Sequence, residues 1–277
     1  MASSKPIRHI RPKQPFSEWL KQLFDRRETL LFFLWKELKV QYRKPILGLG
    51  WSVFQPLVYF GIILLVMQVS GRNTGNTSIP FSLYLISGLA VWNFVTSVVL
   101  GTINSIQSNA GIISKASFPR FFLVLSPMLK GLLDLCIMLV ITFGVALFFG
   151  QQVDLSMLIR FPIAILTAVA TCLGWSAIAA SMVVRTPQIR HAIPIVMYAM
   201  LFVLPVFYDV STLNSTVLSR LYILNPIAGS MDLFRTGFST GLLPITMVSG
   251  WIAQAMLWMM VGVWAFRQVE RKLADLL

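Results

Sequence analysis

The sequence predicts an all-α integral membrane protein with six transmembrane helices. Of its 277 residues, 56% are hydrophobic and only 12% are charged, whereas about a quarter of the residues in a typical soluble domain are charged. The long stretches without a charged residue are 45–71, 73–114, 135–153, 161–184, 191–208 and 236–266. About 20 apolar residues suffice for a helix to cross the hydrocarbon core of a bilayer. The composition therefore excludes an ordinary soluble globular protein.

The region before the first long apolar stretch has two parts. Residues 1–15 are rich in proline and basic residues without a hydrophobic period, which is typical of a flexible basic arm. From residue 16 onward, Phe16, Trp19, Leu20, Leu23 and Phe24 recur at helical spacing opposite polar residues. This pattern predicts an amphipathic interface helix over 16–44 on the cytoplasmic side of the membrane. Packing on a soluble partner instead of lipid is the alternative.

The transmembrane domain is expected over residues 45–267. Its six helices are expected at 46–70, 81–104, 121–149, 161–184, 192–208 and 245–266. Backbone groups find no other partners in lipid, and these runs lack the alternating pattern of barrel strands. Pro56, Pro194 and Pro205 each remove a helical hydrogen bond and predict kinks. A short cytoplasmic tail, 268–277, is expected to follow.

Basic residues gather on one side of this topology. Of 23 lysines and arginines, 11 precede the first expected span, and six crossings place 18 on that same side against four on the other. The positive-inside rule therefore predicts that both termini are cytoplasmic. The net charge of +13 alone would also suit nucleic acid. No aromatic and basic platform interrupts the apolar segments, so we do not expect a nucleic-acid partner.

Residues 209–244, between expected spans five and six, mix charges with short apolar pieces. The charged residues are Asp209, Arg220, Asp232 and Arg235. The apolar pieces are too short to cross, which predicts short re-entrant helices on the outer face. Asn225 and Pro226 are expected to mark a break between them, with the second helix over 232–238. A plain extracellular loop is the alternative.

The chain contains no sequence pattern of a catalytic site. No G-x-x-x-x-G-K-[ST] stretch is present, so we do not expect this chain to hydrolyse ATP itself. His9 and His191 lie far apart in sequence, and neither Cys136 nor Cys172 has the spacing of a metal ligand. Asp134 is the only carboxylate that we expect at membrane depth. We therefore predict no catalytic residue, no metal and no cofactor in this chain.

Two groups of residues within the spans are candidates for function. Lys130 and Asp134 stand four residues apart and predict an intramembrane ion pair. Alternatively, Asp134 reaches a neighbouring helix and helps to set an open or closed state. Candidate residues of a path for sugar rings are Trp51, Phe54, Tyr59, Tyr84, Trp92, Tyr198 and Phe202. Aromatic belts at the membrane surfaces and packing against lipid are the alternative for these rings.

Three motifs in a fixed order carry a resemblance to a known family. They read Y-R-K-P-I-L-G-L-G-W-S-V-F-Q-P at 42–56, N-A-G-I-I-S-K-A-S-F-P-R at 109–120 and L-N-P-I-A-G-S-M-D-L-F-R at 224–235. The chain resembles the permease subunit of polysaccharide ABC exporters, above all those for O-antigen, in the type-2 ABC transporter permease family. The resemblance extends over about residues 30–267. At 186–194 the sequence T-P-Q-I-R-H-A-I-P departs from the more charged version of many relatives.

The resemblance implies an assembly and roles for several residues. Two permease chains would form the channel as a homodimer in the inner membrane, and two separate ATP-binding subunits would hold ATP and Mg²⁺. A short helix is expected over 109–117, with an inert connector as the alternative. The resemblance makes this loop the coupling helix, which would use Asn109, Ser114, Lys115, Phe118, Pro119 and Arg120. Tyr42, Arg43 and Lys44 would lie where the headgroup of a lipid-linked polysaccharide enters, and the segment with Asn225, Pro226, Asp232 and Arg235 would narrow the exit.

Related functions are the alternatives to polysaccharide export. A permease for teichoic acid, capsular polysaccharide, lipid or drug would share most of these features. Drug and small-lipid exporters of the family usually carry a large outer domain between the first two spans, whereas residues 71–80 offer only a short loop. An intramembrane enzyme would need paired polar groups at depth, and only Lys130 with Asp134 qualifies.

Overall fold

The computed structural model describes residues 15–42, 50–69, 79–113, 115–151, 156–208, 222, 224–238 and 244–270, with backbone alone at 40–42, 51–53, 67 and 68. Throughout these ranges the regular elements are helices. They are α1 (Phe16–Asp25), α2 (Arg27–Tyr42), α3 (Gly50–Val69), α4 (Phe81–Ser108), α5 (Ala110–Ile113), α6 (Phe122–Phe148), α7 (Met157–Arg185), α8 (Ile189–Val203), α10 (Pro226–Thr236) and α11 (Ile245–Val269). The predicted all-helical class is confirmed for this part of the chain.

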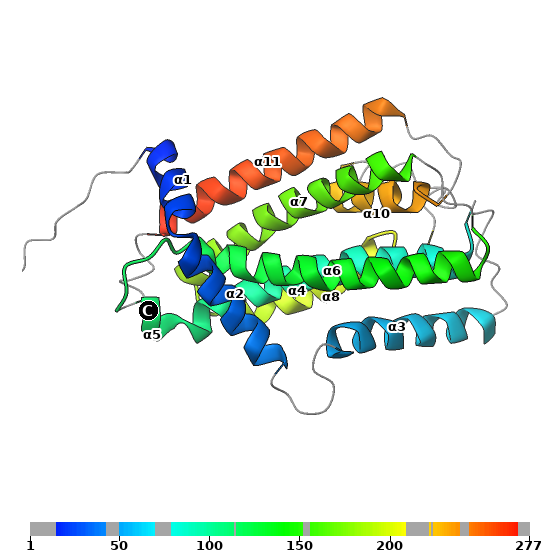
Figure 1. Cartoon of the computed structure of the whole chain (residues 1–277), viewed down its shortest axis with the longest axis horizontal. Helices are drawn as coiled ribbons and strands as arrows, with labels where there is room; N and C mark the ends of the chain where they lie inside the picture. The colour runs from blue at the N-terminus through cyan, green and yellow to red at the C-terminus, as the bar shows by residue number, and fades with distance from the viewer. Residues whose placement is uncertain are drawn as a thin grey trace, which may run out of the picture.

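The long helices form a bundle with two distinct ends. Helices α1, α2 and α5 gather at one end, and α10 lies toward the opposite end (Figure 1). We call the first the basic end, because α1, α2 and residues 115–121 carry many of the arginines and lysines. We call the other the far end. The basic end is the one that the charge distribution predicts to be cytoplasmic.

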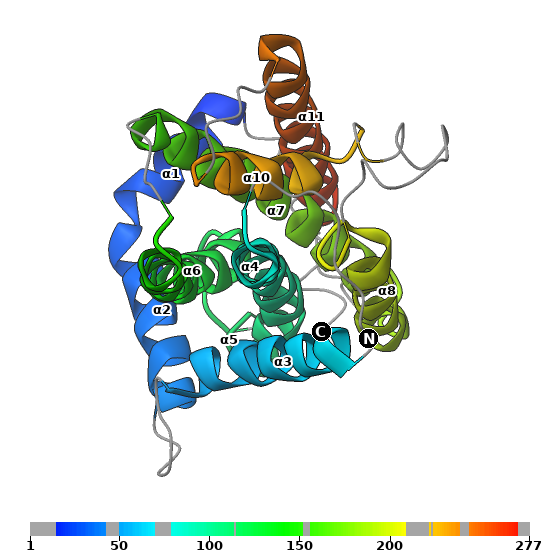
Figure 2. The ribbon, with the colours of Figure 1, turned by 90° about the vertical axis from the view of Figure 1, so that its right-hand side faces the viewer.

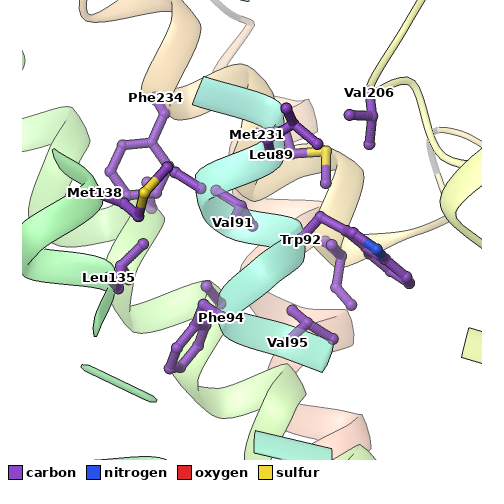
Figure 3. Close-up of a cluster of buried hydrophobic side chains, with 14 of the residues drawn as sticks. Leu89, Val91, Trp92, Phe94, Val95, Leu135, Met138, Val206, Met231 and Phe234 are labelled. Atoms are coloured by element: carbon purple, nitrogen blue, oxygen red, sulfur yellow. The ribbon is translucent and has the colours of Figure 1, made fainter. Parts of the chain in front are cut away.

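Helix α4 occupies the centre of the bundle. Viewed along the bundle, it is surrounded by α6, α7, α10, α8 and α3 (Figure 2). Its apolar side chains pack against those of α6 and α10: Phe94 of α4 lies in one buried cluster with Leu135 and Met138 of α6 and with Met231 and Phe234 of α10 (Figure 3). The most buried helix is thus the one to which the surrounding helices attach.

Within the described residues, α4, α6, α7 and α11 are long and apolar enough to cross a membrane. They correspond to the second, third, fourth and sixth expected spans. The expected spans one and five correspond to α3 and α8, whose apolar helical parts, Phe54–Val66 and Ile189–Val203, are shorter. Helix α8 ends at Val203 because Leu204, which precedes Pro205, is extended. Crossing by α3 and α8 stays a prediction.

The expected single helix over 16–44 is instead two helices. Arg26 interrupts it with φ −105° and ψ 29°. The turn lets α1 place Trp19 on the end of α11, while α2 crosses α6. One straight helix would not reach both sites. The single-helix expectation was therefore wrong because amphipathic spacing does not reveal a turn imposed by tertiary contacts.

The expected start of the outer short helix also differs. Helix α10 begins at Pro226, six residues before the expected position. The Asn225 side-chain oxygen accepts a hydrogen bond from the backbone N–H of Ile227, 3.0 Å away, and Pro226 occupies the first turn. Asparagine as a cap followed by proline is a helix start, which the sequence interpretation took for a break. Residues 209–221, where the preceding short helix was expected, lie outside the described residues.

Helices α7 and α11 approach each other through glycines. A Cβ atom added at Gly174 would lie 2.3 Å from the carbonyl oxygen of Trp258, and one added at Gly262 would lie 2.2 Å from the carbonyl oxygen of Gly174. Such backbone contact between transmembrane helices is possible only where small residues face each other.

Candidate functional site

The loop between α4 and α6 begins at Asn109, which ties α4 to α2. Asn109 follows the last residue of α4 and is 2% exposed. Its side-chain nitrogen donates to the Ser105 carbonyl at 2.7 Å, and its side-chain oxygen accepts from the Lys36 ammonium of α2. A polar residue buried at the end of a central helix thus has partners on two elements. This contact links α2 to the end of α4.

The expected coupling helix is shorter than predicted. Helix α5 has four residues, Ala110–Ile113, whereas the sequence suggested a helix to residue 117. Pro119 has no N–H and keeps the residue before it out of the helical region, which favours irregular backbone over 116–119. Lys115 is exposed and Pro119 is buried. Ser114 lies outside the described residues.

The second half of the loop rests on α2 and on the turn before it. The Phe118 ring packs on Phe33 of α2 with ring centroids 5.0 Å apart, and Phe33 is 2% exposed. The Arg26 guanidinium donates to the carbonyl oxygen of Ser117 at 2.6 Å. The loop is therefore held from the side of α2, while Lys115 and Ser117 remain exposed.

The end of the loop is bound to α11 through Glu270. The backbone N–H of Arg120 donates to the Glu270 carboxylate at 3.1 Å, and the Arg120 guanidinium donates to the Glu270 carbonyl. The other carboxylate oxygen accepts from Trp19 Nε1 of α1 at 3.0 Å. One carboxylate thus joins α1, the loop and the end of α11. This role was not predicted, because nothing in the sequence pairs Trp19 with a residue 251 positions away.

Aromatic rings reinforce the junction around Glu270. Trp19 packs edge-on against Phe121 with centroids 5.1 Å apart, and Phe121 packs in the same way on Phe266 of α11 at 5.4 Å. The Arg267 guanidinium lies 5.5 Å from the Trp19 ring centroid. Edge-to-face aromatic pairs stabilise by about 0.5–1.5 kcal/mol beyond the area that they bury. The three elements therefore form one packed unit.

A second carboxylate, half-buried Glu37, joins α2 to α6. Its side chain accepts a hydrogen bond from the Ser126 hydroxyl of α6 at 2.9 Å. Burial raises the pKa of the Glu37 carboxyl, although hydrogen bonds from Ser126 and Ser105 and the charges of Lys130 and Lys36 act in the opposite direction. Half-buried Lys130 therefore lies within electrostatic reach of Glu37.

The ion pair expected between Lys130 and Asp134 stays a prediction. Asp134 is 3% exposed.

Burial also raises the pKa of the Glu270 carboxyl, opposed by the hydrogen bonds from Trp19 and from the Arg120 backbone and by the charges of Arg120 and Arg267. Above pH 4.5 the folded protein therefore binds more protons at this site than the unfolded chain, and stability falls as pH rises. Glu270→Gln removes this titration and retains the side-chain length. We expect its melting temperature to fall less steeply than that of the wild type as the pH rises above 4.5, the ordinary pKa of the carboxyl group.

Glu18→Gln is the matched control for this prediction, because Glu18 is an exposed carboxylate on α1. Its melting curve should follow the wild type across the same pH range. Glu37 still titrates in both variants, so some pH dependence should persist. An unchanged slope in Glu270→Gln would show that the Glu270 carboxylate is not differently protonated in the folded state.

The residues expected at the headgroup entrance and along the sugar path fall into three groups. Arg43 and Lys44, with the side chains of Tyr42 and Trp51, lie outside the described residues. Phe54 and Tyr59 on α3, and Tyr198 and Phe202 on α8, are exposed. Tyr84 and Trp92 on α4 are 7% and 5% exposed and belong to the buried core. Rings of the last group would contact a substrate only after the helices rearrange.

The expected outer residues lie together at the far end. Asn225 and Pro226 start α10, and Asp232 forms an ion pair with Arg235 at 3.5 Å. Over the described ranges, no group of three or more histidine, cysteine, aspartate or glutamate residues is placed to hold a metal ion. Among the expected site residues, those of the loop over 109–120 at the basic end instead form a segment bound at its base to α2, α4 and α11, with Lys115 and Ser117 exposed.

The chain is similar to known proteins along most of its length. The family model described as ABC-2 type transporter matches residues 28–239. Two O-antigen export system permease proteins RfbA from Klebsiella pneumoniae are 28% and 29% identical to it, each match covering 92% of this chain and 96% of the relative. An O-antigen export system permease protein RfbA from Myxococcus xanthus is 23% identical over 91% of this chain and 96% of the relative. The resemblance inferred from the three motifs is confirmed: the chain belongs to the ABC-2 type transporter family, whose members are membrane permeases.

Proposed function

We propose that this chain is the permease subunit of an exporter that moves a lipid-linked polysaccharide, above all an O-antigen, across a bacterial inner membrane. Two copies form the channel, two separate ATP-binding subunits drive it, and both termini face the cytoplasm. The observation that carries the proposal is the similarity over more than nine-tenths of the chain to proteins named as O-antigen export permeases. The concentration of basic residues supports the orientation.

The loop over residues 109–120 is the surface on which we expect the ATP-binding subunit to dock. Its tip is exposed, and its base is tied to α2 through Asn109 and Phe118 and to α11 through Arg120. A push on the tip therefore moves α2, the end of α4 and the end of α11 together. We expect the movement to reach α3 and α8, whose large side chains are mostly exposed and constrained by few neighbours.

The substrate contacts follow from chemistry at the two ends of the proposed path. Tyr42, Arg43 and Lys44 would bind the pyrophosphate headgroup of the lipid carrier, because arginine forms bidentate hydrogen bonds with phosphate oxygens. The exposed rings Phe54, Tyr59, Tyr198 and Phe202 would stack on the apolar faces of sugar rings. Stacking of this kind does not fix one register, so a long glycan can slide along it.

Deletion and reconstitution test this proposal together. A strain without this chain should accumulate lipid-linked glycan inside the cell and lose it from the surface, and the cloned gene should restore it. The purified chain alone should not hydrolyse ATP, whereas its complex with the ATP-binding subunit should. Normal surface glycan in the deletion strain would contradict the substrate assignment. ATP hydrolysis by the chain alone would contradict the separate motor.

A further inference from the structure

Arg235 of α10 is a buried cation that contacts two other parts of the bundle at the far end. It is 4% exposed. Its Nη2 atom donates to the carbonyl oxygen of Pro205 at 2.7 Å and to that of Tyr84 on α4 at 3.3 Å. The centre of its guanidinium lies 3.5 Å from the centroid of the Tyr84 ring, and Asp232 lies 3.5 Å from Nη1. One side chain thus joins α10, α4 and the segment after α8.

The segment that Arg235 holds is the short stretch that follows α8. Leu204 is extended, so the helix stops and the Pro205 carbonyl is available to a side-chain donor. Leu204 is 2% exposed and Val206 is fully buried. The Tyr84 hydroxyl donates to the Tyr208 carbonyl at 2.8 Å and lies 3.3 Å from that of Pro205. Tyr84 and Arg235 therefore hold the same stretch from two helices.

Gly88 of α4 leaves the space that the guanidinium occupies. A Cβ atom at this position would lie 2.7 Å from Arg235 Nη2 and 3.4 Å from the Cα atom of Val206. Any side chain on α4 here would displace the guanidinium from the Pro205 carbonyl. The absence of a side chain at position 88 is thus a requirement of the Arg235 contact.

The rest of α8 is held much less firmly than its far end. Met197 is the only residue of Ile189–Val203 that is buried, while Ile195 and Phe202 are each 70% exposed. A buried guanidinium that loses its partners in a medium of low dielectric is costly, whereas exposed apolar side chains can exchange one apolar neighbour for another. The contacts of α8 that change most easily are therefore those before its far end.

We propose that Arg235 is a positioning residue that fixes the far end of α8 to α4 and α10, so that α8 moves as a lever about residues 204–206. The fixed point follows from the contacts of Arg235 alone. The movement of the remaining helix rests on the proposed transport function. In this arrangement, a movement that opens the channel at the basic end is transmitted along α8, and the far end of the helix stays attached to α4 and α10.

Hydrogen exchange of the exporter purified with its ATP-binding subunit tests this inference. The amides of Leu204 and of residues 206–208 should exchange slowly in the wild type, both without nucleotide and with ATP bound to a hydrolysis-deficient subunit; Pro205 has no amide hydrogen. In Arg235→Met they should exchange on the order of tenfold faster, because local opening no longer breaks the guanidinium contacts. Gly88→Ala retains the arginine but displaces it, and should accelerate exchange in the same peptide. Gly144→Ala, where a Cβ meets nothing within 4 Å, is the matched control.

Arg235→Lys adds a test of chemistry. Its ammonium can reach a carbonyl but has no planar group to stack on Tyr84, so exchange should be intermediate between the wild type and Arg235→Met. Slow exchange of residues 204–208 in both Arg235→Met and Gly88→Ala would overturn the inference. Faster exchange of the same residues in the wild type when ATP binds would also overturn it. Exchange in 189–203 that is identical with and without ATP would contradict the lever and the gating part of the proposed function, but not the fixed point.

Discussion

Leucine at Gly262 should prevent the protein from accumulating in the membrane in a folded form. A Cβ atom at this position would lie 2.2 Å from the carbonyl oxygen of Gly174 and 2.6 Å from its Cα atom, and backbone atoms cannot rotate away as a side chain can. Helices α7 and α11 would have to separate along their whole contact. Overpacking of a core costs about 1–3 kcal/mol where side chains can adjust, and we expect more here. The yield of monodisperse protein in detergent measures the effect.

The same helix provides a matched control. A Cβ atom at Gly250 of α11 meets nothing within 4 Å, so Gly250→Leu should give a yield and melting temperature close to those of the wild type. Gly262→Ala should fall between the two leucine variants, because it adds only the first atom of the clash. Equal yields for Gly262→Leu and Gly250→Leu would mean that α7 and α11 do not meet through their glycines.

The helices themselves could be predicted, because backbone N–H and C=O groups in lipid find hydrogen-bond partners only within a helix or a closed barrel. The expected span 161–184 is found as Met157–Arg185, and the expected span 245–266 as Ile245–Val269. Each agrees within a few residues: Arg185 ends α7 and Pro244 precedes α11, whereas α7 begins before Arg160 and α11 continues past Arg267. The loop with Asn109 was located by motif, and its contacts with α2 and α11 agree with a role at the basic end.

The contacts that organise the two ends could not be predicted, because they join residues far apart in sequence. Glu270 is one acidic residue among basic neighbours, and its bond to Trp19 leaves no periodic signal. Arg235 was expected among the outer helices, but its main partners are carbonyl oxygens, which every residue carries. Tyr84 was expected in a sugar path because its ring is aromatic. The same ring is buried beneath Arg235.

Alanine at Phe118 should separate ATP hydrolysis from export. The substitution removes the ring that packs on Phe33 of α2 and leaves the bonds of Arg120 to Glu270 in place. The loop would still be present for the ATP-binding subunit, but less of its movement would be carried to α2, because Asn109 would be its remaining contact with that helix. We expect export per permease to fall several-fold, up to about tenfold, because an aromatic pair contributes about 0.5–1.5 kcal/mol and about 1.36 kcal/mol corresponds to a factor of ten in rate. ATP hydrolysis by the purified complex should continue.

Arg120→Ala tests the other end of the loop, because it removes the guanidinium bond to the Glu270 carbonyl and keeps the backbone bond to the carboxylate. Its export should fall in the same way, with the permease still inserted. Phe24→Ala is the control, since Phe24 is an aromatic residue at the same end but is 71% exposed. Normal export in both loop variants would remove the coupling assignment. If both variants lose the ATP-binding subunit, the loop serves assembly instead. A transmitting contact differs from a docking surface because its loss stops export while the complex with the ATP-binding subunit remains intact.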